Sequence, residues 1–270
     1  LVGHSNQIAQ FYMHPFSLSS IKRGPKASEH LKTYYKTFEE IKSQGLDALI
    51  ISGANVSHPD LQRAPFYEQL KEVVDWSYEN VTSTLCSCLA THAVLEFKYG
   101  QKRQPVGAKH WGVFPHKVVN RSHPLIKGVN TRFDIPHSRF NEISELQFAK
   151  AEVEVLAKSP IGVHLAVSPD LFRIVFFQGH PEYDAISLLK EYKREVALYL
   201  ENNGTEYPPI PSNYLSLQSQ AILEEYRTKL DSKKASIADF PEALIANRLD
   251  NTWHDSANAI INNWIGCVYQ

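Results

Sequence analysis

One cysteine stands where an apolar run gives way to a helical pattern. Residues 81–87 (VTSTLCS) have the β-branched, apolar character of a buried strand, and Cys88 follows them directly. Ligands bind at the carboxyl ends of parallel strands, and the free N–H groups that open the next helix favour a thiolate. The backbone N–H of Leu89 can then face an oxyanion. The pattern favours a nucleophilic cysteine in a strand-to-helix elbow, although a small cysteine packed in the core fits it as well.

A histidine and a glutamate follow another apolar run. Residues 171–177 (LFRIVFF) predict a strand, and His180 and Glu182 come shortly after its end. An imidazole suits the removal of a proton from a thiol and then from a substrate hydroxyl. Across the φ-fixing Pro181, Glu182 can hold one ring nitrogen and stabilise the imidazolium. A turn with both side chains in water is the other interpretation, but together with Cys88 they predict a thiol triad.

The segments that must position these residues alternate between strand and helix patterns. Residues 47–52 and 81–87 predict buried strands, and residues 66–78 and 89–99 predict the helices that follow them. This order predicts an α/β fold with a doubly wound, mostly parallel sheet flanked by helices. Before it, we expect a strand over residues 8–16.

Further elements are expected around this unit. Residues 28–44 predict a helix, with Ser28 as its N-cap and Gly45 at its end. The region 111–177 is rich in strand patterns, and helical patterns resume after it.

Two parts of the chain are expected. We predict an α/β catalytic domain over residues 1–203, which ends on a long amphipathic helix over residues 184–202. Residues 204–270 begin with a Pro-rich connector and continue as charged helices. We predict that they form a helical extension packed on the same domain.

The composition excludes several functional classes. The chain has 270 residues, of which 43% are hydrophobic and 21% charged, as in soluble globular proteins. A net charge of −1 provides no basic surface for nucleic acid, and no apolar stretch approaches the roughly 20 residues of a membrane span. Three cysteines and no visible signal peptide predict a cytoplasmic protein without a disulfide framework. Scattered histidines and the lack of a Gly-rich phosphate loop predict neither a metal nor a nucleotide cofactor.

Several longer motifs resemble those of the homoserine O-succinyltransferase/O-acetyltransferase family. They occur in the family's order and spacing, and they are DALIISGAN (47–55), DWSYENVTSTLCSC (75–88), KHWGVF (109–114), DIPHSRF (134–140) and GHPEYD (179–184). The resemblance implies a class I glutamine amidotransferase-like, flavodoxin-like fold. It also implies a ping-pong reaction in methionine biosynthesis, in which an acyl group passes from acyl-CoA through a cysteine to the hydroxyl of L-homoserine. Acyl-CoA would be a co-substrate, no cofactor would stay bound, and the protein would be a homodimer.

The resemblance also implies roles for particular residues. The family's triad matches Cys88 as nucleophile, His180 as general base and acid, and Glu182 as orienter. The family's substrate-binding residues match Lys109, Ser138 and Arg194. The physical chemistry agrees for the arginine, because a guanidinium can grip an α-carboxylate through two hydrogen bonds.

One position in the loop after residues 47–52 sorts the acyl donor in this family. Ser57 occupies it here, and its small, neutral side chain neither fills the pocket nor repels a carboxylate, which favours succinyl over acetyl. The same loop can supply a second backbone donor to the oxyanion, beside Leu89. Asn55, Val56 and Ser57 are the alternatives, and we take Val56.

The sequence departs from the family in three ways. It lacks the family's N-terminal strand with a Pro-Lys-Lys motif, Leu89 stands where the family often has Trp, and residues 205–255 diverge. Two other functions therefore stay open. One is a glutaminase of the amidotransferase class, although such enzymes commonly have Gly beside the nucleophile and this chain has Ser87 and Leu89. The other is a catalytically silent binding paralogue.

Overall fold

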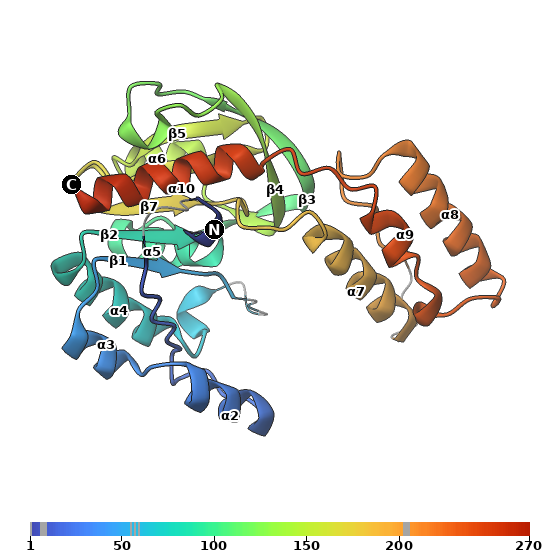
Figure 1. Cartoon of the computed structure of the whole chain (residues 1–270), viewed down its shortest axis with the longest axis horizontal. Helices are drawn as coiled ribbons and strands as arrows, with labels where there is room; N and C mark the ends of the chain where they lie inside the picture. Colours follow the sequence, from blue (N-terminus) through green and yellow to red (C-terminus); the bar gives the residue numbers. More distant parts are fainter. Residues whose placement is uncertain (1, 6–9, 55, 57, 59, 202–205) are drawn as a thin grey trace.

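The computed structural model describes residues 2–5, 10–54, 56, 58, 60–201 and 206–270 (Figure 1). In these residues, strands form one seven-stranded sheet in the order β1-β2-β7-β6-β5-β3-β4. The strands are β1 (Ala48–Ile51), β2 (Ser83–Ser87), β3 (Gln104–Val118), β4 (Arg132–Glu142), β5 (Glu154–Ser159), β6 (Gly162–Val167) and β7 (Ile174–Phe177). The helices are α1 (Val2–Ser5), α2 (Pro25–Tyr34), α3 (Phe38–Gln44), α4 (Tyr67–Asn80), α5 (Leu89–Tyr99), α6 (Glu145–Lys150), α7 (Ser187–Glu201), α8 (Leu217–Asp231), α9 (Glu242–Ala246) and α10 (His254–Tyr269). The predicted α/β class is confirmed.

The sheet is mixed. The predicted parallel arrangement holds for β1, β2 and β7, whereas the pairings that run from β7 through β6, β5 and β3 to β4 are antiparallel. A parallel connection needs a long crossover, usually a helix, and α4 provides one between β1 and β2. From β3 onward the strands mostly follow one another through short connections, which favour antiparallel neighbours. Hydrophobic patterns do not distinguish these two arrangements.

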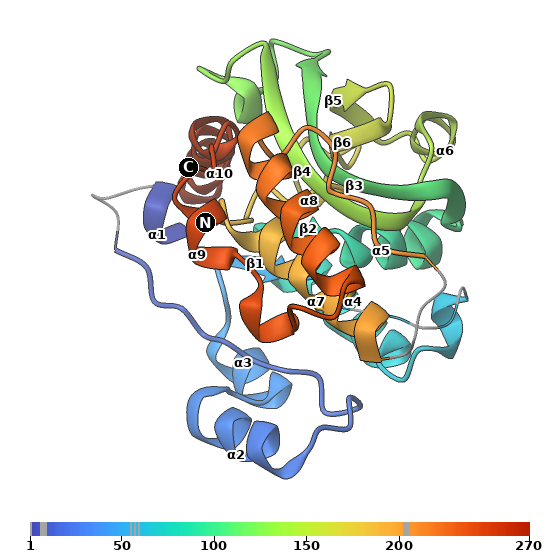
Figure 2. The same cartoon turned by 90° about the vertical axis from the view of Figure 1, so that its right-hand side faces the viewer.

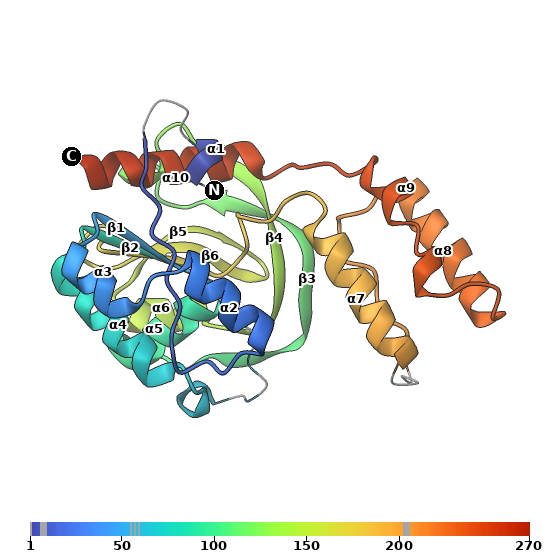
Figure 3. The ribbon, with the colours of Figure 1, turned by 60° about the horizontal axis from the view of Figure 1, so that its bottom comes forward.

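Helices cover both faces of the sheet. Alternate residues of β2 point to opposite faces, so Cys86 packs with α4 and α5 while Leu85 packs with α10. Figure 1 shows α10 across one face and α4 on the other side, and Figure 3 shows α1 beside α10. The indole N–H of Trp264 on α10 donates to Ser83 Oγ at 2.8 Å. The strand that leads to the candidate nucleophile is therefore enclosed from both sides.

The predicted strand over residues 8–16 is not formed in its described part. Its first two residues lie outside the described residues, and Phe16 makes one isolated bridge to Lys36. Tyr12 and Met13 are largely exposed. An apolar run becomes a strand only where a neighbouring strand offers a ladder, and the described part of this run finds none beyond that bridge.

The predicted helix over residues 28–44 is two helices. The first, α2, begins before Ser28, so this residue is not the N-cap. The second, α3, begins at a capping box in which the side chains of Thr37 and Glu40 bond each other's backbone N–H groups. Gly45 ends α3 with a φ of +76°, as predicted. The Thr-x-x-Glu signal for a new helix start lies inside the predicted helix.

Helices α7, α8 and α9 project to one side of the sheet (Figure 1), and they lie in front of it when that side faces the viewer (Figure 2). The rings of Tyr192, Tyr226 and Phe240 pack together between them. The connector before α8 is tied to β3, since the Val113 N–H donates to the Ser212 carbonyl at 2.8 Å. The predicted boundary at residue 203 lies outside the described residues, so the division into two parts stays a prediction.

Gly112 is the residue of β3 that lies against this connector. Substituting it therefore tests whether the connector is attached to β3. The φ of Gly112 is +143°, and a Cβ there would lie 2.1 Å from the Ser212 carbonyl oxygen. We expect Gly112→Ala to lower the free energy of unfolding by about 2–4 kcal/mol, because strain and overlap add. Gly107→Ala, on the same strand with open space around its Cβ, is the control and should change it by less than about 0.5 kcal/mol. Equal urea midpoints for the two variants would contradict this attachment.

Candidate active site

The chain turns sharply at Cys88. This residue follows β2 and is the N-cap of α5, with φ +52° and ψ −111°. A left-handed φ is strained for a residue with a side chain, and such strain clusters at functional sites. The Cys88 N–H donates to the Phe177 carbonyl at 2.8 Å, which fixes the turn against the end of β7. The structure thus contains the predicted elbow. Cys86, by contrast, is fully buried, and burial raises the pKa of its thiol.

His180 and Glu182 lie in the turn after β7. The His180 N–H donates to the Pro136 carbonyl at 2.8 Å, which ties the turn to β4. The imidazole Nδ1 lies 2.9 Å from Glu182 Oε1, and the ring stacks on Tyr183 with 4.3 Å between centroids. The Cys88 side chain is near enough to the imidazole to raise the pKa of His180. The three predicted triad residues are therefore together, with the ring held along its edge and on one face.

The histidine and the glutamate of this site favour each other's charged forms. Burial alone would lower the pKa of His180, but the hydrogen bonds and charges of Cys88 and Glu182 outweigh it and raise that pKa to about 10. Burial alone would raise the pKa of Glu182, but the bond to His180 and its charge lower it below the ordinary value. A stabilised imidazolium suits a histidine that receives the proton of a thiol.

Three further buried histidines form a cluster behind the triad turn, namely His116, His137 and His164. Burial lowers the pKa of His116 to about 4 and takes the pKa values of the other two well below the ordinary value. They are neutral at pH 7. A Cβ on Gly179, just before the triad histidine, would lie 2.8 Å from His137 Nε2 and 2.4 Å from Ile135. Only glycine therefore fits between this cluster and the triad turn.

The loop after β1 reaches the nucleophile. A Cβ on Gly53 would lie 3.3 Å from both Cys88 Cβ and the Leu89 nitrogen. The backbone of this loop is therefore close to the N–H that we assign to the oxyanion. Of the alternatives for a second donor, Asn55 and Ser57 lie outside the described residues, and the role of Val56 stays a prediction.

Four side chains contact the carboxylate of Glu191 on α7. Its Oε2 accepts hydrogen bonds from Ser138 Oγ at 2.7 Å and from Trp111 Nε1 at 3.0 Å, and its Oε1 accepts one from Tyr183 Oη. Lys109 Nζ lies 4.0 Å from Oε2 and over the Trp111 ring. Since Tyr183 stacks on the triad histidine, this carboxylate stands beside the triad. It is a half-buried carboxylate with polar and cationic partners.

Two of the three predicted substrate-binding residues contact this carboxylate. Lys109 and Ser138 contact Glu191, and Arg194 follows it at the i+3 spacing that places two residues on one helix face. The Arg194 side chain is 55% exposed and pairs with Glu195 at 3.4 Å. Burial lowers the pKa of Lys109, although the charges of Glu191 and Glu195 oppose this shift; the charge of Arg194 adds a smaller lowering. Sequence reasoning missed Glu191, although its spacing from Arg194 was a usable signal.

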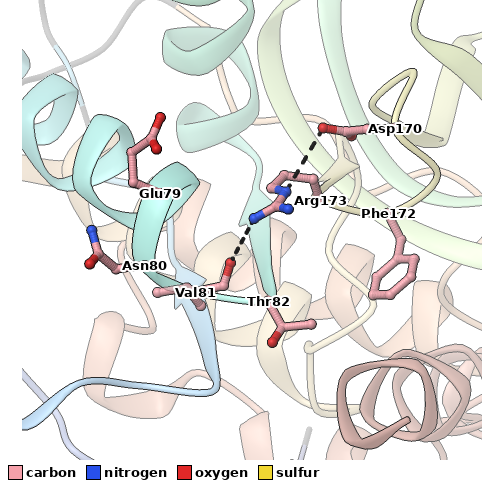
Figure 4. Close-up of a pocket in the computed structure, with 7 residues that line it drawn as sticks. All are labelled: Glu79, Asn80, Val81, Thr82, Asp170, Phe172 and Arg173. Carbon is pink, nitrogen blue, oxygen red and sulfur yellow. Dashed lines mark hydrogen bonds and ion pairs between the residues drawn. The ribbon is translucent and has the colours of Figure 1, made fainter.

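A hollow lies at the opposite end of these strands, before the first residues of β2 and β7 (Figure 4). Arg173 lies in it, donates to the Val81 and Tyr78 carbonyls and pairs with Asp170 at 3.9 Å. Its guanidinium is therefore already engaged.

In the described residues, no group of three or more His, Cys, Asp or Glu side chains could hold a metal ion. None of the described helices is long and apolar enough to cross a membrane.

Enzymes that move acyl groups through a thiol combine a cysteine, an imidazole and an orienting carboxylate, and this α/β sheet brings three such side chains to one end of its strands. The family model for homoserine O-succinyltransferase matches residues 1–270. The chain belongs to the homoserine O-succinyltransferase family.

Two curated relatives agree with this family. A homoserine O-succinyltransferase from Nitrosococcus oceani is 61% identical over 100% of this chain and 76% of its own length. One from Thioalkalivibrio nitratireducens is 60% identical over 100% of this chain and 77% of its own length. Among solved structures, a glutamine amidotransferase from Methylobacillus flagellatus is similar with a TM-score of 0.49 and 14% identity, covering 94% of this chain and 92% of that one.

The charged pair predicts a pH-dependent contribution to stability. The raised pKa of His180 contributes stability that is complete below about pH 6.5 and lost as the pH rises through about 10. The lowered pKa of Glu182 contributes stability that is lost only as the pH falls below its ordinary value of 4.5. Glu182→Gln should therefore cost about 1–3 kcal/mol between pH 5 and 6.5 and progressively less toward pH 10. Urea unfolding across this range measures it, and a cost that does not vary with pH would contradict the ion pair.

Proposed function

We propose that the protein transfers a succinyl group from succinyl-CoA to the hydroxyl of L-homoserine, with Cys88 as the acyl carrier. The carrying observation is the hydrogen-bonded His180–Glu182 pair beside a cysteine at a strand-to-helix elbow. The names of the relatives at 60% and 61% identity support succinyl as the group and homoserine as the acceptor. We extend the proposal to a cytoplasmic homodimer that serves methionine biosynthesis and holds no permanent cofactor.

In the first half of the reaction, the imidazole of His180 takes the Cys88 proton. The thiolate attacks the thioester carbonyl carbon of succinyl-CoA, and the resulting oxyanion receives the N–H of Leu89 and a second N–H from the loop after β1. The tetrahedral intermediate then collapses and the bond to the CoA sulfur breaks. The imidazolium returns its proton to the departing sulfur, which leaves a succinyl thioester on Cys88.

In the second half, the histidine acts on the acceptor. Acylation removes the thiolate, whose hydrogen bond and charge helped to raise the pKa of His180, so the neutral imidazole becomes available as a base. It takes the proton of the homoserine hydroxyl while the oxygen attacks the thioester carbonyl. Collapse of the second intermediate releases O-succinylhomoserine, and the regenerated thiolate faces the imidazolium again.

The acceptor site has charges of both signs. Lys109 and Arg194 are the cations that we assign to the α-carboxylate of homoserine, which a guanidinium can bind through two hydrogen bonds. Glu191 offers a carboxylate to the α-ammonium group, and Ser138 is held against it. This arrangement selects an amino acid rather than a simple alcohol.

The acyl carrier can be identified by mass spectrometry of the intact protein mixed with succinyl-CoA in the absence of an acceptor. We expect one succinyl adduct that maps to Cys88 and disappears when homoserine is added. Cys88→Ala should form no adduct and lose at least about 10³-fold in kcat/KM, because the nucleophile is gone. Cys267→Ala removes a half-buried thiol far along the chain and should keep both properties. Release of ammonia from glutamine by the wild type would favour a glutaminase instead.

Donor choice is tested at Ser57. A glutamate there adds bulk and a negative charge that should repel the distal carboxylate of succinyl-CoA. We expect Ser57→Glu to lower the ratio of succinyl to acetyl transfer by about tenfold or more, and Ser57→Gln, which adds the bulk without the charge, to lower it less. An unchanged ratio in both variants would assign donor choice to other residues.

A further inference from the structure

Ser87 is the residue of β2 that immediately precedes Cys88. It lies opposite Phe177 in the parallel pairing of β2 with β7, so it stands beside the point where β7 enters the triad turn. Its side chain is almost fully buried, with 5% of the residue exposed. A hydroxyl at such a site has to find a partner, because an unbonded one would cost free energy that an apolar side chain would not.

The partner of this hydroxyl is the triad carboxylate. Ser87 Oγ lies 3.1 Å from Glu182 Oε1, and this carboxylate oxygen also lies 2.9 Å from His180 Nδ1. An ionised carboxylate only accepts hydrogen bonds, so the hydroxyl and the imidazole both donate to this oxygen. The two donors come from the ends of different strands. Together they fix which carboxylate oxygen faces the ring.

The hydroxyl adds an anchor to those that the Glu182 carboxylate has in the imidazole and in its own backbone N–H. The Glu182 side chain is 32% exposed, so water competes for its oxygens. Without the hydroxyl, rotation of the carboxylate toward water would leave the imidazole Nδ1–H without a fixed acceptor. The charged and titratable groups around this carboxylate are His180, Cys88 and Tyr183.

We propose that Ser87 is a fourth, positioning member of the site, which acts through Glu182 to hold the His180 imidazole toward Cys88. The role rests on the proposed thiol mechanism. It requires no contact between Ser87 and substrate. When the thiol proton moves to the imidazole, the ring keeps its Nδ1–H on the anchored oxygen, and the new imidazolium is stabilised by a carboxylate that does not have to reorient.

The test compares Ser87→Ala with Ser87→Thr, which restores a hydroxyl. Two readouts are followed from pH 5 to 10, namely the rate of Cys88 alkylation by iodoacetamide and kcat/KM for succinyl transfer. For Ser87→Ala we expect kcat/KM to fall about three- to tenfold with the KM for homoserine unchanged, and the limb of both profiles that reports His180 to move to lower pH. Ser87→Thr should recover most of the rate and the wild-type profile.

A structural role alone would give a different result. Ser77→Ala removes another buried serine hydroxyl, in α4 and away from the site, and should change stability without moving either profile. If Ser87→Ala behaved in the same way, with both profiles and kcat/KM within twofold of the wild type, the positioning role would be overturned. Alkylation uses no acyl donor, so it separates the two proposals. A wild type that forms no succinyl adduct would refute the acyl transfer while a shifted alkylation profile in Ser87→Ala still supported the positioning role.

Discussion

The parallel pairing of β2 with β7 is the constraint on which the site depends. Both strands end at the same edge of the sheet, so the cysteine after one meets the histidine after the other. The bond from the Cys88 N–H to the Phe177 carbonyl closes this junction. On the other side of β2, parallel β1 brings Gly53 against Cys88. A slip of one residue in either register would turn the side chains to the opposite face of the sheet, and Cys88 would no longer meet His180.

Four buried histidines of this fold have pKa values shifted in opposite directions. Against the effect of burial, Cys88 and Glu182 raise the pKa of His180, whereas His116, His137 and His164 lie among rings and one another, and burial lowers their pKa values. Burial acts in the same direction on all four, so the difference comes from the partners. Gly179 is the residue at which the triad turn approaches His137 of this cluster most closely, so a side chain there would overlap with it.

The sequence predicted the parts of the site that depend on local order. Cys88 and His180 each follow an apolar run, and strand ends are visible in a single sequence. Lys109 and Ser138 were reached only by resemblance, because their partner comes from a distant helix. That partner, Glu191, reads as an ordinary surface acid until α7 is seen to lie beside the triad. The sequence analysis also missed the antiparallel half of the sheet, because the direction of strand pairing depends on the connections between strands and not on the hydrophobic period.

Helix α10 shields the face of β2 that carries Leu85, and it does so through residues far along the chain, such as Trp264 bonded to Ser83. A nascent chain that leaves the ribosome therefore carries the nucleophile strand with one apolar face open to water until residues 254–264 have been translated. Partly made sheets with such a face aggregate readily and are typical clients of chaperones. Burial of this face of β2 is thus coupled to the docking of α10, although about 170 residues separate the two elements in the chain.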